Sequence, residues 1–168
     1  MPSSPSSAEQ ELPSLNMRYL EGTVGYSIRR AQMAVFQDIY ASFGDKAVTL
    51  VQFSVMAVAA DNPGVTQWAL AEVLAVERPR MVPVLNQLEA LGLVQRKVCE
   101  HDRRSRRIEL TAAGKKRLLE LKRRFAAHEA QLEKRLGGPT SALLETLHRL
   151  GGLGRASRGN KAPRTAKA

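Results

Sequence analysis

Two short helical segments joined by a turn of a few residues constrain the fold of this chain more than any other feature. Thr66 can cap a first helix over residues 67–74. A second helix starts near Arg78, tolerates Pro79 in its first turn and ends before Gly92. The residues expected to face inward from the first helix are Leu70, Val73 and Leu74. This spacing, with basic side chains opening the second helix, is typical of a helix-turn-helix.

A charged hairpin is predicted directly after these helices. Residues 93–98 and 107–110 have strand-like composition, and the segment between them is polar and densely basic. Arg103, Arg104 and Arg106 crowd its tip. Like charges on a short loop repel one another unless an anion arrives, so this tip favours nucleic-acid contact over a purely structural role.

Amphipathic helices flank this unit. We expect one helix over residues 17–43, a buried helix opened by a capping box at Thr49 and Gln52, a long helix from Thr111 to about 136 and a last helix over about 140–150. The fold class is therefore mainly α with a small β-hairpin wing. A single copy would expose the apolar stripes of the terminal helices, which predicts a homodimer that pairs residues 17–35 and 115–153.

Charge points to a polyanionic partner. The chain of 168 residues has 26 basic and 16 acidic side chains, and residues 96–124 hold twelve basic against four acidic ones. Aromatic residues are only 5 % of the chain, which argues against modules that stack single-stranded bases. Residues 1–16 and the basic residues 154–168 lack apolar periodicity and are expected to be disordered tails.

Enzymatic, metal and membrane functions find no support in the sequence. One cysteine, Cys99, excludes an internal disulfide, and no signal peptide or membrane-spanning run is visible, so a cytoplasmic protein is expected. The spacing of His101, His128 and His148 favours structural or solvated roles over a metal site. No catalytic constellation can be named, and we expect no cofactor and no enzymatic activity.

Several strings together resemble the multiple-antibiotic-resistance regulator (MarR) family. They are residues 70–74 (LAEVL), 78–82 (RPRMV), 88–94 (LEALGLV) and 102–114 (DRRSRRIELTAAG). The resemblance covers residues 20–150 and implies a dimeric winged helix-turn-helix that binds operator DNA, often as a repressor released by phenolic or aromatic carboxylate ligands. Pro83 departs from the family pattern, which often has a polar or basic residue there.

The resemblance implies a single domain over residues 17–153 that has two functional parts. A DNA-binding lobe is expected at about 46–112, and dimerisation helices at about 17–44 and 112–153.

Candidate DNA contacts lie at the start of the second helix and in the wing. Arg78 and Arg80 can enter a major groove and bind guanine or phosphate, and Val82 can meet a thymine methyl. The alternative is a solvated basic helix start. The resemblance implies that Arg104 enters a minor groove, and Asp102 is expected to orient an arginine. The full set is Arg78, Pro79, Arg80, Val82, Arg103, Arg104 and Arg106, with Asp102 as orienter.

The effector and the mode of action leave alternatives open. Tyr26, Arg29 and Arg30 of the first helix would suit an aromatic acid or its coenzyme A thioester, although both arginines can equally form ion pairs or lie in solvent. A ligand-responsive repressor is the leading hypothesis. The second is a ligand-independent architectural or nucleoid protein that uses its basic tail for unspecific affinity.

Overall fold

The computed structural model describes residues 15–44, 48–98 and 106–152. The chain forms two compact units, Met1–Asp38 and Ile39–Ala168. The described part is mainly helical and contains one two-stranded antiparallel sheet. The expected fold class, a winged helix-turn-helix with a small hairpin wing, is confirmed.

The N-terminal helix is interrupted, so the prediction of one helix over residues 17–43 is wrong. Helix α1 (Arg18–Glu21) ends at Gly22, and α2 (Val24–Phe43) begins after Thr23. The backbone N–H and the hydroxyl of Thr23 both donate to the carbonyl oxygen of Leu20, at 2.9 and 2.8 Å. A hydroxyl that bonds to nearby backbone competes with regular helix, which explains the break. Gly44 follows α2 with a φ of +76°, as the helix end predicted there requires.

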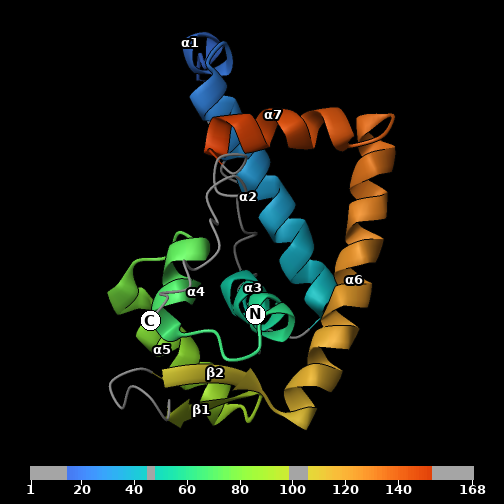
Figure 1. Ribbon diagram of the computed structural model, residues 1–168. Coiled ribbons are helices and arrows are strands. Elements are labelled where there is room, and N and C mark those ends of the chain that lie inside the picture. The colour runs from blue at the N-terminus through green and yellow to red at the C-terminus, as the bar shows by residue number, and fades with distance from the viewer. Residues whose placement is uncertain (1–14, 45–47, 99–105, 153–168) are drawn as a thin grey trace, which may run out of the picture. The chain divides into compact units, whose positions relative to one another are not determined.

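Helix α3 (Leu50–Asp61) forms the centre of the second unit. The predicted capping box is present: the Thr49 hydroxyl accepts from the Gln52 N–H, and the Gln52 side chain accepts from the Thr49 N–H. Val55 and Met56 are fully buried. Figure 1 shows α3 between α6 on one side and α4 with α5 on the other. The helix is therefore buried on most sides, as its apolar run predicted.

Helices α4 (Gln67–Val73) and α5 (Arg78–Ala90) form the helix-turn-helix. The Thr66 hydroxyl caps α4 by accepting from the Ala69 N–H at 3.2 Å. Leu70 is fully buried and Leu74 is half-buried, but Val73 is 66 % exposed, so its predicted inward position is wrong. The buried arc of α4 is centred between Leu70 and Ala71, and Val73 lies about 110° from it at 100° per residue.

The wing consists of β1 (Val94–Val98) and β2 (Arg106–Leu110), paired antiparallel from Val94 opposite Leu110 to Val98 opposite Arg106. Both predicted strands are present within one residue of their expected bounds. A second attachment holds the wing to the lobe, because the Ile108 N–H donates to the Val65 carbonyl oxygen at 2.9 Å. The hairpin therefore has a fixed base against the helix-turn-helix.

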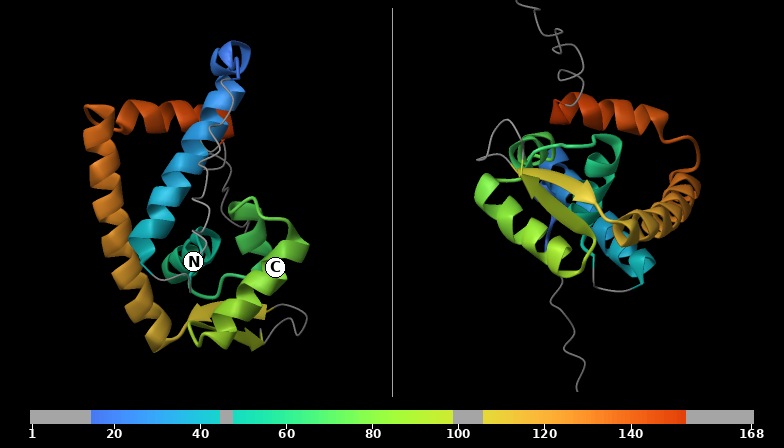
Figure 2. Two further views of the ribbon diagram at one scale, coloured as in Figure 1. Left: turned by 180° about the vertical axis from the view of Figure 1, so that it is seen from behind. Right: turned by 60° about the horizontal axis from the view of Figure 1, so that its bottom comes forward.

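Helix α6 (Ala112–Leu136) starts where the wing ends, and α7 (Ser141–Gly151) follows it. Figure 2 shows α6 running away from the hairpin and α7 turning at its far end. The Thr111 hydroxyl caps α6 by accepting from the Gly114 N–H at 3.0 Å. A Cβ at Gly114 would collide with the carbonyl oxygen of Leu93, so only glycine lets the first turn of α6 approach the wing this closely.

The packing of α6 against the lobe is aromatic and polar. The Phe125 ring stacks on Phe53 with centroids 5.2 Å apart, and Phe43 meets Phe53 edge-on at 5.5 Å. Beside them, the Arg124 guanidinium donates to the Phe43 carbonyl oxygen at 2.8 Å and to Glu120 at the same distance. These contacts fix the end of α2 to α6.

Candidate nucleic-acid interface

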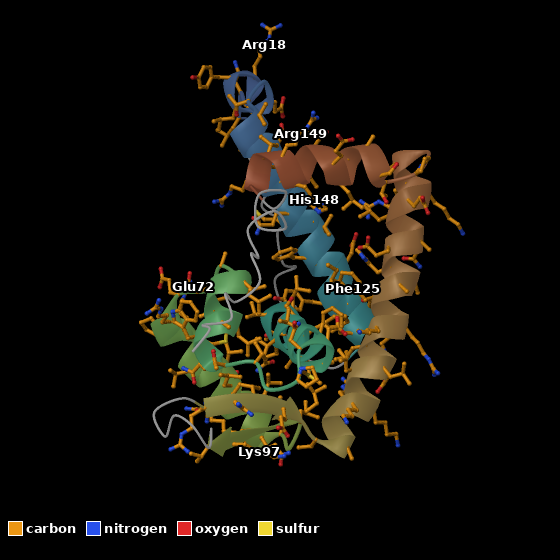
Figure 3. The ribbon with its side chains drawn as sticks, viewed as in Figure 1. Arg18, Glu72, Lys97, Phe125, His148 and Arg149 are labelled. Atoms are coloured by element: carbon orange, nitrogen blue, oxygen red, sulfur yellow. The ribbon has the colours of Figure 1, made fainter. Side chains whose placement is uncertain are left out.

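Arg78 opens α5 and is engaged by two side chains of α4. Its Nη2 lies 3.1 Å from Oε1 of Glu72, and its Cζ lies 5.5 Å from the centroid of the Trp68 ring. Figure 3 labels Glu72 on α4. These contacts could not be predicted from the sequence, because they join residues six and ten positions apart across the turn between α4 and α5. Arg78 nevertheless stays on the surface, with 64 % of its side chain exposed.

The other candidates on α5 are all exposed. Met81, Leu85 and Leu88 form the buried face of the helix. Pro79, Arg80 and Pro83 are exposed, and Val82 is 42 % exposed. Pro83, the residue that departs from the family pattern, thus lies on the solvent face of α5. The surface that α5 offers outward is therefore the one that carries the predicted base and phosphate contacts.

The candidate residues of the wing are only partly described. Arg106 is the first residue of β2 and is exposed. Asp102, Arg103 and Arg104 lie outside the described residues, as do Cys99 and His101. Their roles stay predictions.

A set of contacts that ties the wing to α5, here called the Arg96 strut, was not predicted from the sequence; α5 is the second helix, or recognition helix, of the helix-turn-helix. Arg96 of β1 reaches α5, where its Nη1 donates to Glu89 at 2.6 Å and its Nη2 donates to Asn86 at 2.6 Å. The Glu89 carboxylate also accepts from the backbone N–H of Arg96 at 3.3 Å. The signal available in the sequence was only that opposite charges stand at 89 and 96, and such pairs are too common to identify a contact.

A second ion pair stays within the hairpin. Lys97 of β1 lies 2.6 Å from Glu109 of β2, and Figure 3 labels Lys97 on the wing. The hydrogen bond from Lys97 holds the pKa of the Glu109 carboxyl below its ordinary value. The Arg96 pair thus ties β1 to α5, whereas the Lys97 pair joins the two strands of the wing to each other.

The effector candidates Tyr26, Arg29 and Arg30 all lie on α2, in the first unit. Positions three and four apart share a face of a helix, so the phenol and the two guanidinium groups are neighbours on α2. Tyr26 is half-buried and both arginines are exposed. Their role in ligand binding stays a prediction.

Histidine and acidic residues of the described ranges form no metal centre. No group of three or more His, Cys, Asp or Glu side chains among residues 15–44, 48–98 and 106–152 could hold an ion. His128 is buried beside Phe125, with ring centroids 6.2 Å apart, and its Nδ1 has no hydrogen-bond partner in that part of the chain. None of the described helices is long and apolar enough to cross a bilayer.

Comparison with known proteins decides the family. The sequence profile of the MarR family matches residues 48–105. A putative transcriptional regulatory protein for the hcr operon of Thauera aromatica is 31 % identical over 147 residues, which cover 84 % of this chain and 89 % of that protein. This chain belongs to the MarR family. It is a DNA-binding transcriptional regulator with the winged helix of that family.

Solved structures of MarR-family repressors match most of the chain. The transcriptional repressor CouR bound to a 23-mer DNA duplex is 36 % identical, with a TM-score of 0.78, and 82 % of this chain matches 98 % of that one. CouR bound to p-coumaroyl-CoA is 34 % identical, with a TM-score of 0.75, and 82 % of this chain matches 97 % of it. The fold of this chain thus matches nearly the whole length of these two repressor structures.

Proposed function

We propose that this MarR-family protein is a homodimeric repressor that is released from operator DNA by an aromatic acid or its coenzyme A thioester. The observation that carries the proposal is the match to CouR over 97 % or more of its length, in structures that hold a DNA duplex and p-coumaroyl-CoA. The exposed basic start of α5 supports the DNA part of the proposal.

In this proposal α5 enters the major groove and the wing enters an adjacent minor groove. Arg78, Pro79, Arg80 and Val82 make the major-groove contacts. Arg103, Arg104 and Arg106 contact the backbone and minor groove, and Asp102 orients one of them. The strut from Arg96 supports this arrangement, since it ties the wing to α5.

The homodimer uses the helices of residues 17–44 and 112–153. The support comes from α7, an amphipathic helix with no buried residue in a single copy. Its four leucines are each more than 40 % exposed: Leu143, Leu144, Leu147 and Leu150. An apolar stripe of this kind is normally covered by a partner, and a second copy supplies a self-complementary one.

The first test is the selection of an operator from a pool of random duplexes, followed by fluorescence anisotropy at several salt concentrations. We expect the selected site to bind roughly 10³-fold or more tightly than random DNA. A ratio near one with a steep salt slope would instead favour the architectural DNA-binding protein.

The second test adds p-coumaroyl-CoA, free p-coumarate or coenzyme A to the operator complex. Release by either aromatic compound, but not by coenzyme A alone, supports the proposed effector class. The double variant Arg29→Ala/Arg30→Ala should keep its DNA affinity and lose the response, because it removes the cations proposed to bind the ligand. Arg18→Ala in α1 is the matched control and should respond normally. If the double variant also responds normally, both arginines are excluded from the effector site.

A further inference from the structure

The contacts of Arg78 differ from those of its neighbour Arg80. Trp68 and Glu72 stand four residues apart on α4 and so share one face of that helix. Together they hold the Arg78 guanidinium, with the carboxylate at 3.1 Å and the indole ring at 5.5 Å. Arg80 forms no ion pair or hydrogen bond through its side chain with the described residues, although it is exposed on the same turn of α5.

The stability of the fold does not explain this cluster. The side chains of Arg78 and Glu72 are 64 % and 54 % exposed, and Trp68 is 56 % exposed. Ion pairs with this exposure contribute little to folding because water screens them. The consequence of the cluster is instead geometric: it limits the directions in which one guanidinium of the DNA-facing helix can point.

A restrained guanidinium suits base reading better than phosphate binding. Glu72 occupies one of the five N–H donors of Arg78, which leaves donors for the paired acceptors O6 and N7 of a guanine. The side chain loses less conformational freedom on binding when it is already oriented. The Glu72 carboxylate also offsets the attraction of Arg78 for phosphates, since it repels them.

We propose that Trp68 and Glu72 are positioning residues that make Arg78 a reader of sequence, while the unrestrained Arg80 supplies affinity that is independent of sequence. The inference rests on the proposed binding of operator DNA through α5. It assigns a role in operator specificity to two residues of α4 that need not touch the bases themselves.

The test compares two substitutions that remove the same charge. Glu72→Gln replaces the carboxylate that pairs with Arg78 by a neutral amide. Glu77→Gln is the matched control, because Glu77 is also exposed, immediately precedes Arg78 and makes no side-chain cap hydrogen bond. Affinities for the selected operator and for a random duplex are measured for each variant, and their ratio is the readout. Thermal melting verifies that each variant is folded.

Glu77→Gln should strengthen binding to both duplexes alike and leave the ratio unchanged. Glu72→Gln and Trp68→Leu should each lower the ratio, on the order of tenfold, with little loss of affinity for random DNA. Arg78→Lys should lower it similarly, and Glu72→Gln should cause no further loss in the Arg78→Lys background, because the two residues act as a unit. Arg80→Ala should weaken binding to both duplexes and reduce the salt slope.

Trp68 gives an independent readout, since it is the one tryptophan of the sequence. Its emission should change on operator binding, and by less on binding of random DNA, because a guanine bound by Arg78 changes the surroundings of the ring that contacts this cation. Equal ratios for Glu72→Gln and Glu77→Gln, or an unchanged ratio for Arg78→Lys, would overturn the inference. Failure of the proposed function is distinct, because the unmodified protein itself would then show no preference for any duplex.

Discussion

At the scale of single residues, backbone carbonyls decide which side chains are tolerated. Gly114 stands in the first turn of α6 beneath the Leu93 carbonyl oxygen, and the Thr111 hydroxyl bonds both the Gly114 N–H and the Gly92 carbonyl oxygen. The wing and α6 therefore meet through backbone atoms rather than through side chains. Backbone atoms cannot rotate away as a flexible side chain can, so the junction is intolerant of added volume.

Replacement of Gly114 by alanine should destabilise the fold by about 1–3 kcal/mol, because the new methyl group overlaps a backbone oxygen. Urea unfolding measures the loss. Gly138→Ala is the control: a Cβ there would meet no atom within 4 Å, and its unfolding curve should match that of the parent protein. A Gly114→Ala protein as stable as the control would refute the close approach of α6 to the wing.

The lowered pKa of the Glu120 carboxyl predicts how the stability of the fold depends on pH. Its hydrogen bond from Arg117 and its further pair with Arg124 hold the pKa of the carboxyl below the ordinary value of 4.5. A carboxyl with a lowered pKa in the folded state stabilises fully above its ordinary pKa and loses that contribution as pH falls through the lowered value. The melting-temperature advantage of the parent protein over Glu120→Gln should therefore shrink between about pH 7 and about pH 3. An advantage that is constant over this range would contradict the ion pair.

At the scale of secondary structure, local chemistry was predictable and contacts between elements were not. The caps at Thr49, Thr66 and Thr111 were correct because each depends on residues within three positions. Helix periodicity alone could not foresee the break at Thr23, where a side chain bonds the preceding turn. The Arg96 strut escaped prediction for a different reason: its partners lie on another element, at a distance that no periodicity encodes.

Arg96 should matter for the angle between wing and recognition helix. Arg96→Met keeps most of the side-chain length but removes the hydrogen bonds to Glu89 and Asn86. The backbone amide hydrogens of β1 should therefore exchange faster with solvent. Operator affinity should fall by about 1 kcal/mol or more, with weaker hydroxyl-radical protection of the minor groove.

Lys97→Met is the matched control for this variant. It removes one positive charge from the neighbouring position. The ion pair that it breaks, with Glu109, joins the two strands of the hairpin and does not reach α5. Its minor-groove protection should remain near that of the parent protein. Equal losses in both variants would show that charge alone, and not the strut, accounts for the effect.

At the scale of the whole molecule, the four leucines of α7 form an apolar stripe that is exposed in a single copy of the chain. Leu147 lies in the middle of this stripe, 41 % exposed. Leu147→Glu should give a monomer in sedimentation experiments, because a charge in a dimer interface must be desolvated. Operator affinity should fall at least about tenfold, since one half-site is then bound without the other.

Glu145→Gln tests whether this effect is specific to the leucine stripe. Position 145 stands about 200° from 147 around the helix and is exposed. The variant should stay dimeric and bind as the parent protein does. A dimeric Leu147→Glu protein with normal affinity would exclude α7 from the dimer interface.

The turn between α4 and α5 also bears on how this regulator can evolve. Ala75 has a φ of +50°, a left-handed conformation that costs an alanine roughly 1–2 kcal/mol. A single change to asparagine or glycine, which adopt that conformation readily, can recover part of this energy. The stability gained by such a change at position 75 can offset destabilising substitutions on the neighbouring recognition helix. Lineages that acquire this change can therefore explore new operator sequences without losing the fold.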